Sequence, residues 1–202
     1  MHSVAILTIS DLWVERGESD LLNGLSFSAR SGDVVHITGA NGAGKSTFFK
    51  ALLGLLPILS GSMTFNGDSL TQQRQNFLNN TLYIGHSAGL NGALTVMENI
   101  RWYLPKCSEK IVEQALSELS LGAFAETQLH ALSAGQVRRV ALVRLWLSEQ
   151  QIWLLDEPFT ALDQGLISML EAKMAAHVAS GGIVILASHL PLAHLSYLQV
   201  EL

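Results

Sequence analysis

The sequence contains a single cysteine, Cys107, among its 202 residues. One cysteine excludes an intramolecular disulfide framework, and Cys107 has no cysteine or histidine neighbour at the spacing of metal ligands. Free cysteines usually behave as small apolar side chains. We therefore expect Cys107 to be a partly buried thiol rather than a reactive group.

Long uninterrupted apolar runs are also missing, although 49% of the residues are hydrophobic. A membrane-spanning helix needs roughly 18 or more consecutive apolar residues. The segment 1–11 has no Lys or Arg before its short apolar stretch, and no small-residue cleavage pattern follows it, so it does not look like a signal peptide. We expect a cytoplasmic protein that does not cross a bilayer by itself.

Basic charge is scarce, since 12 Lys and Arg stand against 17 Asp and Glu and give a formal net charge of −5. The basic residues are scattered, whereas proteins that bind nucleic acid gather them in a stripe or a tail. We therefore expect no nucleic-acid partner. A length near 200 residues fits one α/β domain with a large core.

Short apolar runs alternate with helical patterns and predict the order of the elements. Strands are predicted at residues 4–9, 25–29, 34–38, 62–66, 82–85, 152–155 and 183–187. Helices are predicted at 46–56, stopping at Pro57, and at 164–179. Between residues 90 and 149 the period is helical almost throughout, with a capping box of Thr95 and Glu98. This order predicts an α/β fold with a largely parallel core sheet and a helical insertion.

A glycine-rich segment lies between the predicted strand 34–38 and the predicted helix 46–56. It satisfies the pattern G-x-x-x-x-G-K-S/T with Gly39, Ala40, Asn41, Gly42, Ala43, Gly44, Lys45, Ser46 and Thr47. Glycines let the backbone aim its N–H groups at phosphates, and the helix N-terminus adds partial positive charge. A glycine-rich turn can match by accident, but the strand-to-helix context favours an ATP site. Lys45 would then contact the β- and γ-phosphates, and Ser46 would hold Mg²⁺.

Two adjacent carboxylates, Asp156 and Glu157, follow the predicted strand 152–155. Open parallel sheets bind ligands at this end of their strands. Taken alone, an Asp-Glu pair here is more often helix-capping chemistry. Together with the glycine-rich segment, it predicts that Asp156 binds Mg²⁺, directly or through water, and that Glu157 polarises the attacking water. The sequence thus predicts ATP hydrolysis, with ATP and Mg²⁺ as cofactors.

The segment between these two motifs contains Leu132-Ser133-Ala134-Gly135-Gln136, which resembles the LSGGQ signature of ABC ATPases with Ala134 in place of the first glycine. In that family, the signature of one subunit closes over the γ-phosphate held by the other. The resemblance implies a head-to-tail dimer, completed in trans by Ser133, Ala134, Gly135 and Gln136. The same residues fit a plain helix start, because Ser133 and Gln136 form a capping box and the free N–H groups suit an anion.

Two further segments extend the resemblance. Ala161-Leu162-Asp163 resembles the loop that joins the two ATP sites, which implies that Asp163 lies at the dimer interface. His189, after the predicted strand 183–187, resembles the switch histidine that contacts the γ-phosphate and the attacking water. A lone histidine after a strand is otherwise usually structural or exposed. The resemblance implies three catalytic residues: Lys45, Glu157 and His189.

The resemblance covers nearly the whole chain and implies the fold of an ABC ATPase. That fold is a P-loop NTPase with an N-terminal antiparallel β region, a largely parallel core sheet and a helical subdomain carrying the signature. We expect a single domain, 1–202, in which residues 1–89 and 150–202 form the nucleotide-binding core and 90–149 the helical subdomain.

Within the family, five segments look like those of the ATP-binding subunits of bacterial cytochrome c maturation: residues 84–86, 132–136, 138–142, 144–147 and 181–186. This implies a role in heme export or handling, integral membrane subunits of that system as partners, and a peripheral position on the cytoplasmic face of the bacterial inner membrane. The alternatives are an ABC ATPase for another membrane substrate and a mainly regulatory ATP-binding subunit. ABC ATPases of DNA repair or translation usually carry two fused halves or a coiled-coil insertion, and the sequence shows neither.

The chain departs from the family pattern at two positions. Arg16 stands before Gly17 where many members have an aromatic residue that stacks on adenine. A guanidinium can stack on a purine, so we expect Arg16 to take that role, with Trp13 as the alternative and a solvated Arg16 equally compatible. Ser87 stands where the family has a glutamine that reaches Mg²⁺. Because a serine side chain is shorter, we expect Ser87 to reach Mg²⁺ only through water.

Overall fold

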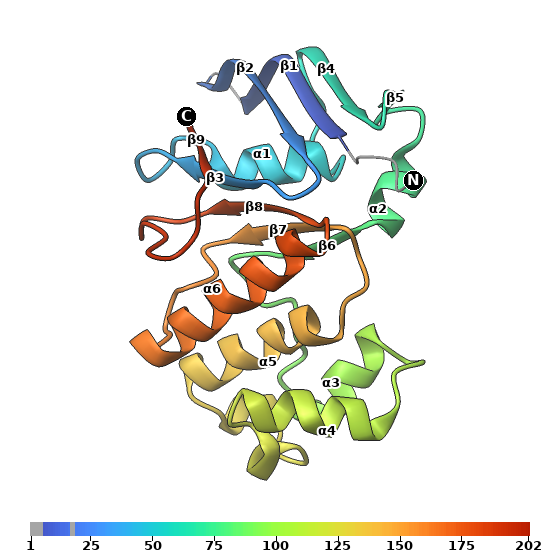
Figure 1. The fold of residues 1–202 in the computed structure, drawn as a ribbon, viewed down its shortest axis with the longest axis vertical. Coiled ribbons are helices and arrows are strands. Elements are labelled where there is room, and N and C mark those ends of the chain that lie inside the picture. Colours follow the sequence, from blue (N-terminus) through green and yellow to red (C-terminus); the bar gives the residue numbers. More distant parts are fainter. Residues whose placement is uncertain (1–5, 17–18) are drawn as a thin grey trace.

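The computed structural model describes residues 6–16 and 19–202, and the side chains of these except 16 and 19–21. Figure 1 shows two sheets stacked with helices between and below them. A four-stranded sheet has the order β2-β1-β4-β5, and a five-stranded sheet has the order β6-β7-β8-β3-β9. The two sheets are the scaffold on which the functional segments are mounted.

The four-stranded sheet is antiparallel and confirms the predicted N-terminal β region. Its strands are β1 (Ile6–Arg16), β2 (Ser19–Arg30), β4 (Ser60–Phe65) and β5 (Asp68–Ser69). Strands β1 and β2 are longer than the sequence predicts. The buried side chains Leu7, Ile9, Leu12 and Val14 continue along β1 across register shifts, so the apolar face extends beyond the regular alternation.

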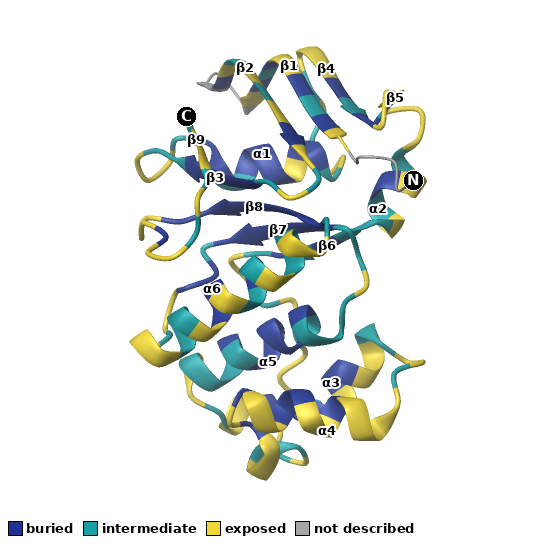
Figure 2. Cartoon of the chain, in the orientation of Figure 1, coloured by how far each residue is buried: buried dark blue, intermediate teal, exposed yellow. Residues whose placement is uncertain are grey.

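The five-stranded sheet is parallel throughout the described residues, as predicted for the core. Its strands are β6 (Thr81–Ile84), β7 (Ile152–Asp156), β8 (Ile183–Ala187), β3 (Val34–Thr38) and β9 (Leu198–Glu201). All residues of β7 and β8 are buried, because helices cover both faces, and these strands are therefore apolar without alternation (Figure 2). Strand β9 was not predicted.

Helix α1 (Lys45–Leu52) lies between the two sheets (Figure 1) and buries Phe48 and Phe49. The sequence predicted a helix to Leu56, but α1 ends at Leu52 because Gly54 adopts a left-handed φ of 74°. The short helix α2 (Arg74–Asn79), which precedes β6, was not predicted.

The other face of the core sheet is covered by α6 (Gln164–Ala179) and α5 (Ala134–Leu147) (Figure 1). Helices α3 (Val96–Tyr103) and α4 (Glu109–Glu118) lie beyond α5, with 3-10 turns at Gly122–Phe124 and Leu129–Ala131. These helices share a hydrophobic cluster of their own, against which the half-buried Cys107 packs. The helical character of this region is as predicted.

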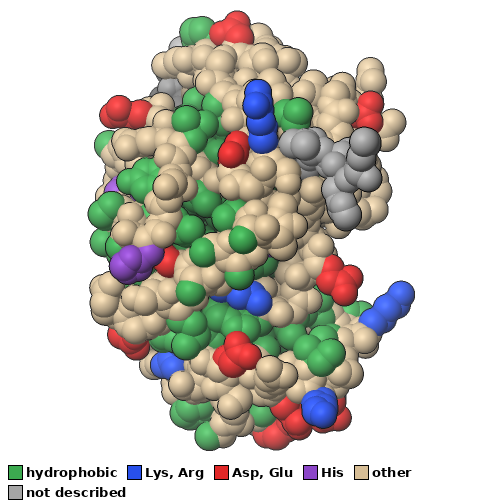
Figure 3. Space-filling view, viewed as in Figure 1, with side chains coloured by type: hydrophobic (Ala, Val, Ile, Leu, Met, Phe, Trp, Pro, Cys, Tyr) green, Lys and Arg blue, Asp and Glu red, His purple; other side chains and the backbone are tan. Residues whose placement is uncertain are grey.

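Two surface properties of the described residues bear on function. No helix among them combines the length and apolar character needed to cross a bilayer. On the face shown in Figure 3, Lys and Arg side chains lie apart from one another rather than in a stripe.

Candidate ATP-binding site

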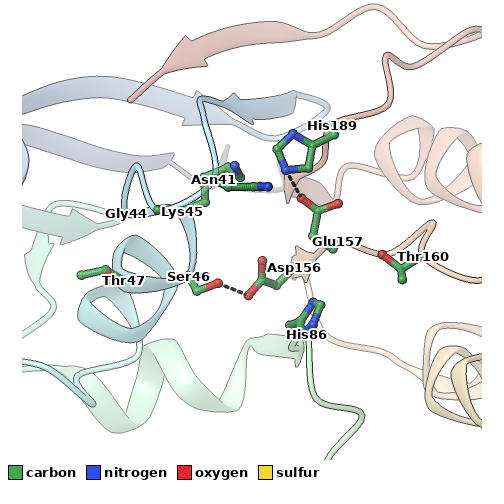
Figure 4. A pocket seen from close by; sticks show the side chains of 11 residues that line it. Asn41, Gly44, Lys45, Ser46, Thr47, His86, Asp156, Glu157, Thr160 and His189 are labelled. Carbon is green, nitrogen blue, oxygen red and sulfur yellow. Dashed lines mark hydrogen bonds and ion pairs between the residues drawn. The ribbon is translucent and has the colours of Figure 1, made fainter.

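A cavity of about 660 Å³ lies at the carboxyl ends of the parallel strands. We call it the phosphate cavity, because the glycine-rich segment predicted to bind phosphates lines it. Its walls come from the segments that follow β3, β6, β7 and β8, which a parallel sheet brings to one edge. The lining residues are Asn41, Gly42, Gly44, Lys45, Ser46, Thr47, His86, Asp156, Glu157, Thr160 and His189. Figure 4 shows that the glycine-rich segment faces the two carboxylates and His189 across this space. The structure thus brings together residues that the sequence separates by more than 100 positions.

The glycine-rich segment turns through backbone conformations that favour glycine. Gly39, Gly42 and Gly44 have φ values of 145°, 88° and 98°, and Gly44 caps the start of α1. A Cβ on Gly39 would lie 3.0 Å from the carbonyl oxygen of Leu202. The segment therefore depends on glycine both for its turn and for its close packing.

Lys45 is buried, at 8% exposure, without a carboxylate partner in any described contact. Its Nζ donates to the carbonyl oxygens of Gly39 at 2.7 Å and Ala40 at 3.1 Å. A buried ammonium bonded only to neutral carbonyls is far from full electrostatic compensation. Phosphate oxygens of a nucleotide would supply that compensation.

Ser46 and Asp156 meet across the cavity. The Ser46 hydroxyl donates to Asp156 Oδ2 at 2.7 Å, and Asp156 is buried at the end of β7. A hydroxyl beside a carboxylate is the oxygen donor set that Mg²⁺ takes, with water and phosphate completing the shell. The residues present therefore fit a Mg²⁺ ion.

Glu157 follows Asp156 in a strained backbone conformation, with φ of 50°. Its N–H donates to the carbonyl of Ala187 at 2.8 Å, which ties it to β8. Its Oε1 is buried without a hydrogen-bond partner and lies 3.4 Å from His189 Nε2. An orphaned carboxylate oxygen that faces a cavity is suited to accept a hydrogen bond from water.

His189 lies on the loop after β8, and its side chain is half exposed. Two buried side chains hold this loop. His36 donates from Nε2 to the Ser188 carbonyl at 2.9 Å, while Glu171 accepts from the N–H groups of Ala193 and His194 at 3.1 and 3.0 Å. Neither residue was predicted to have a role, although each is a lone polar residue within an apolar strand or helix face.

Ser133 caps α5, and the predicted capping box is confirmed. The Ser133 N–H donates to Gln136 Oε1 at 2.8 Å, and the Gln136 N–H donates to Ser133 Oγ at 3.3 Å. Ser133 and Ala134 are exposed, and no signature residue lines the phosphate cavity of its own chain. A Cβ on Gly135 would lie 2.8 Å from the Ala161 carbonyl oxygen, so glycine allows the signature to approach the loop before α6.

Asp163 caps the first turn of α6, since its Oδ1 accepts from the Leu166 N–H at 2.9 Å. The preceding Ala161 has a left-handed φ of 62°. The segment 161–163, which resembles the loop that joins the two ATP sites, thus forms a turn with a left-handed residue and a helix cap, and it lies next to Gly135 of the signature.

Of the two residues expected to stack on adenine, Arg16 and Trp13, the structure describes the side chain of Trp13 only. Arg16 ends β1, but its side chain lies outside the described residues. Trp13 does not line the phosphate cavity; its indole N–H donates to Asp11 Oδ1 at 3.0 Å, and its ring lies next to Gly24.

Ser87 and His86, although adjacent, line different cavities. His86 lines the phosphate cavity (Figure 4). Ser87 is exposed and lines a separate cavity of about 380 Å³, together with Leu129, His130 and Val137 of the helical region. The position of the family's glutamine therefore faces the junction with the helical region.

Arg138 is a buried residue next to the cavity, and no role for it was predicted from the sequence. Its guanidinium donates to backbone carbonyls at the ends of β6 and β7. Burial lowers the pKa of Arg138, and the Asp156 and Glu157 carboxylates oppose that shift. Burial and Asp156 together raise the pKa of Tyr83, which lies next to Gly85, to about 12. Tyr83 is therefore neutral near Asp156 at physiological pH.

Comparison with known proteins adds an independent line of evidence. The sequence pattern of the ABC transporter family matches residues 22–160. The chain is 43% identical over 187 residues to the cytochrome c biogenesis ATP-binding export protein CcmA of Salmonella typhi, covering 93% of this chain and 91% of that protein. It is 42% identical over 189 residues to CcmA of Escherichia coli K12, covering 94% and 91%. A solved ATP-binding subunit of an ABC transporter superposes with a TM-score of 0.81 at 28% identity, covering 92% of this chain and 80% of that one.

Proposed function

Because this chain belongs to the ABC transporter family of ATP-binding proteins, we propose that it hydrolyses ATP to power a membrane complex of cytochrome c biogenesis, with heme export or handling as its task. The observation that carries the hydrolytic part is one cavity lined by Lys45, Asp156, Glu157 and His189. Identity of 43% to a cytochrome c biogenesis export protein supports the biological part.

In this proposal, the phosphates lie in the turn of residues 39–47. The backbone N–H groups at the start of α1 face them, and Lys45 replaces its two carbonyl contacts with contacts to phosphate oxygens. Burial makes this exchange favourable, because the ammonium gains charged partners in a site of low polarity.

Ser46 and Asp156 would hold Mg²⁺, which when bound supplies positive charge to the phosphate oxygens. The exposed Ser87 lines the neighbouring cavity, which supports contact with Mg²⁺ through water at most. The loop of residues 85–89 then serves chiefly as a mechanical link toward the membrane partner.

Glu157 orients the attacking water and accepts its proton through the otherwise unbonded Oε1. His189, 3.4 Å away, steadies this carboxylate and contacts the γ-phosphate. The hydrogen bonds of His36 and Glu171 to the backbone of the loop that carries His189 support a fixed position of the imidazole relative to the γ-phosphate.

The signature residues do not line the cavity of their own chain, and Ser133 and Ala134 are exposed, which supports a head-to-tail dimer. A second copy would present Ser133, Ala134, Gly135 and Gln136 to the γ-phosphate, with Asp163 at the interface. Residues 1–89 and 150–202 would act as the nucleotide-binding core, and 90–149 as the helical subdomain. Integral membrane subunits of the cytochrome c maturation system would hold this dimer at the cytoplasmic face of the inner membrane.

Arg16 is the residue we propose to stack on adenine. Trp13 is engaged with Asp11 and Gly24 and lies outside the phosphate cavity. Arg16 is the last residue of β1 and occupies the position at which many members of the family have an aromatic residue that stacks on adenine.

The test is steady-state ATP hydrolysis by the purified chain, alone and with its co-purified membrane subunits. Mg²⁺-dependent hydrolysis that Glu157→Gln abolishes is the expected result. Absence of hydrolysis even with the membrane subunits would indicate a regulatory ATP-binding subunit instead.

The biological role is tested in cells that lack the gene. Heme-stained c-type cytochromes should disappear and return with the parent gene, but not with Glu157→Gln. Normal cytochrome c levels in the deletion strain would assign the ATPase to another membrane substrate.

A further inference from the structure

Arg138 occupies a junction between the helix that begins with the signature and the ends of two core strands. It lies on α5, five residues after the helix cap Ser133, and is only 6% exposed. Helix α5 packs beneath the edge of the core sheet that holds β6 and β7 (Figure 1). The side chain therefore reaches from the helical region toward the catalytic segment.

Within the described part of the chain, the Arg138 guanidinium makes four hydrogen bonds, and all of them end on backbone carbonyls. Nη2 donates to Asp156 at 3.0 Å and to Glu157 at 2.8 Å, and Nε donates to Pro158 at 3.4 Å. Nη1 donates to Gly85 at 2.9 Å. One side chain thus joins the backbone that carries the proposed catalytic carboxylate to the backbone that begins the loop of residues 85–89.

The chemistry of these acceptors explains why an arginine stands here. Strands that end inside a protein leave carbonyl groups without ladder partners, and buried carbonyls need donors. A guanidinium offers five N–H donors in a rigid planar fork, which a lysine ammonium does not. The positive charge is also partly balanced by the carboxylates of Asp156 and Glu157.

The neighbouring residue, Arg139, provides a natural comparison. It lies on the same helix, and its Nη1 donates to the carbonyl of Leu119 at 3.3 Å, within the helical region. It has no described bond to the core strands. The link from α5 to the catalytic backbone is therefore specific to Arg138 among these two adjacent arginines.

We infer that Arg138 is a positioning residue that couples the signature helix to the backbone of Glu157 and of Gly85. The inference rests on the proposed function, in which Glu157 activates water and Ser133 meets the phosphate of the opposite subunit. Glu157 has a strained φ of 50°, so its orientation depends on the contacts that hold it. When a phosphate engages the start of α5, a shift of this helix is transmitted through the guanidinium to Glu157 and to the loop of residues 85–89.

The test compares Arg138→Met and Arg138→Lys with Arg139→Met as a matched control. If Arg138 positions Glu157, Arg138→Met should lower kcat at least about tenfold while the affinity for a fluorescent ATP analogue changes by less than about twofold. Arg138→Lys should recover part of kcat, because it restores the charge and one donor site but not the fork. Arg139→Met should keep the kcat of the parent.

A second readout does not depend on turnover. In hydrogen exchange, ATP should protect the backbone of residues 133–137 and 157–160 together in the parent and in Arg139→Met. In Arg138→Met, or in Arg138→Lys if the methionine variant does not fold, residues 133–137 should still be protected by ATP, whereas protection at 157–160 should be lost.

Three results would overturn the inference: a kcat loss no larger than in Arg139→Met, a loss that matches a fall in thermal stability, or joint protection preserved in both Arg138 variants. Failure of the proposed function gives a different pattern. The parent would then lack hydrolysis with its membrane subunits, while the exchange readout would still decide whether Arg138 links the two segments.

Discussion

At the scale of single residues, the cavity is lined by the buried ammonium of Lys45 and by Glu157, whose Oε1 has no hydrogen-bond partner among the described residues, and we expect the tasks of these two residues to be separable. Lys45→Ala should weaken ATP binding and hydrolysis together, because the buried ammonium neutralises phosphate charge. Glu157→Gln should retain ATP and lose most turnover, roughly a hundredfold or more, because only water activation is removed. Nucleotide binding and kcat, measured for both variants, check this, and unchanged hydrolysis in Glu157→Gln would remove Glu157 from the mechanism.

Ser87 replaces the glutamine of the family and lines a cavity other than the phosphate cavity. Both observations predict that Ser87 does not bind Mg²⁺ directly. Ser87→Ala should hydrolyse ATP within about threefold of the parent, since the hydroxyl lines a cavity other than the phosphate site. Ser87→Gln should also be tolerated, because the side chain is exposed and has room. The measurement is the Mg²⁺ dependence of ATP binding and hydrolysis. A collapse of Mg²⁺-dependent binding in Ser87→Ala would make the hydroxyl a required ligand.

At the scale of elements, the contact between α6 and β7 contains a half-buried histidine, His177, that makes stability depend on pH. The ring of His177 stacks on Trp153 at 3.8 Å, and Nε2 donates to the Gln151 carbonyl at 3.1 Å. Burial lowers the pKa of His177 below its usual 6.5, with a smaller contribution from Lys173. As pH falls through 6.5, the unfolded chain takes up a proton that the folded chain does not, so this residue contributes a loss of stability below 6.5 and none above it.

The prediction is that the free energy of unfolding falls less steeply between pH 7 and pH 5 in His177→Gln than in the parent, as measured by urea denaturation about every half pH unit. His194→Gln is the control, because the His194 side chain is exposed. Equal slopes for the parent and His177→Gln would show that His177 gains its proton at the same pH in both states.

At the scale of the whole molecule, the separation of the signature from the cavity of its own chain predicts complementation between defective subunits. Lys45→Ala and Ser133→Arg should each lose activity alone. When the two proteins are mixed, both defects can fall in one site of a heterodimer, leaving the other site with intact motifs, so part of the ATPase activity should return. Crosslinks in the ATP-bound state should join residue 133 of one subunit to residue 42 of the other, and crosslinks that consistently exclude this pair would contradict the head-to-tail dimer.

Local sequence determined the parts of this protein whose chemistry is written in consecutive residues. The turn of residues 39–47 needs glycines at left-handed φ, the capping boxes of Thr95 and Ser133 are local hydrogen-bond patterns, and apolar runs without alternation specify the buried strands β7 and β8. The parallel order and the ligand-binding edge follow from the alternation of strand and helix.

Only the tertiary structure decided which buried polar groups bond to the backbone segments around the cavity. Arg138 bonds to carbonyls 18 to 53 positions away in the sequence, and His36 bonds to a carbonyl 152 positions away. Glu171 accepts from N–H groups 22 and 23 positions away. The edge strand β9 pairs with β3 from across the chain, and Ser87 and His86 separate into different cavities through packing alone. Such contacts depend on where strand ends and loops converge in space, and no local pattern encodes that convergence.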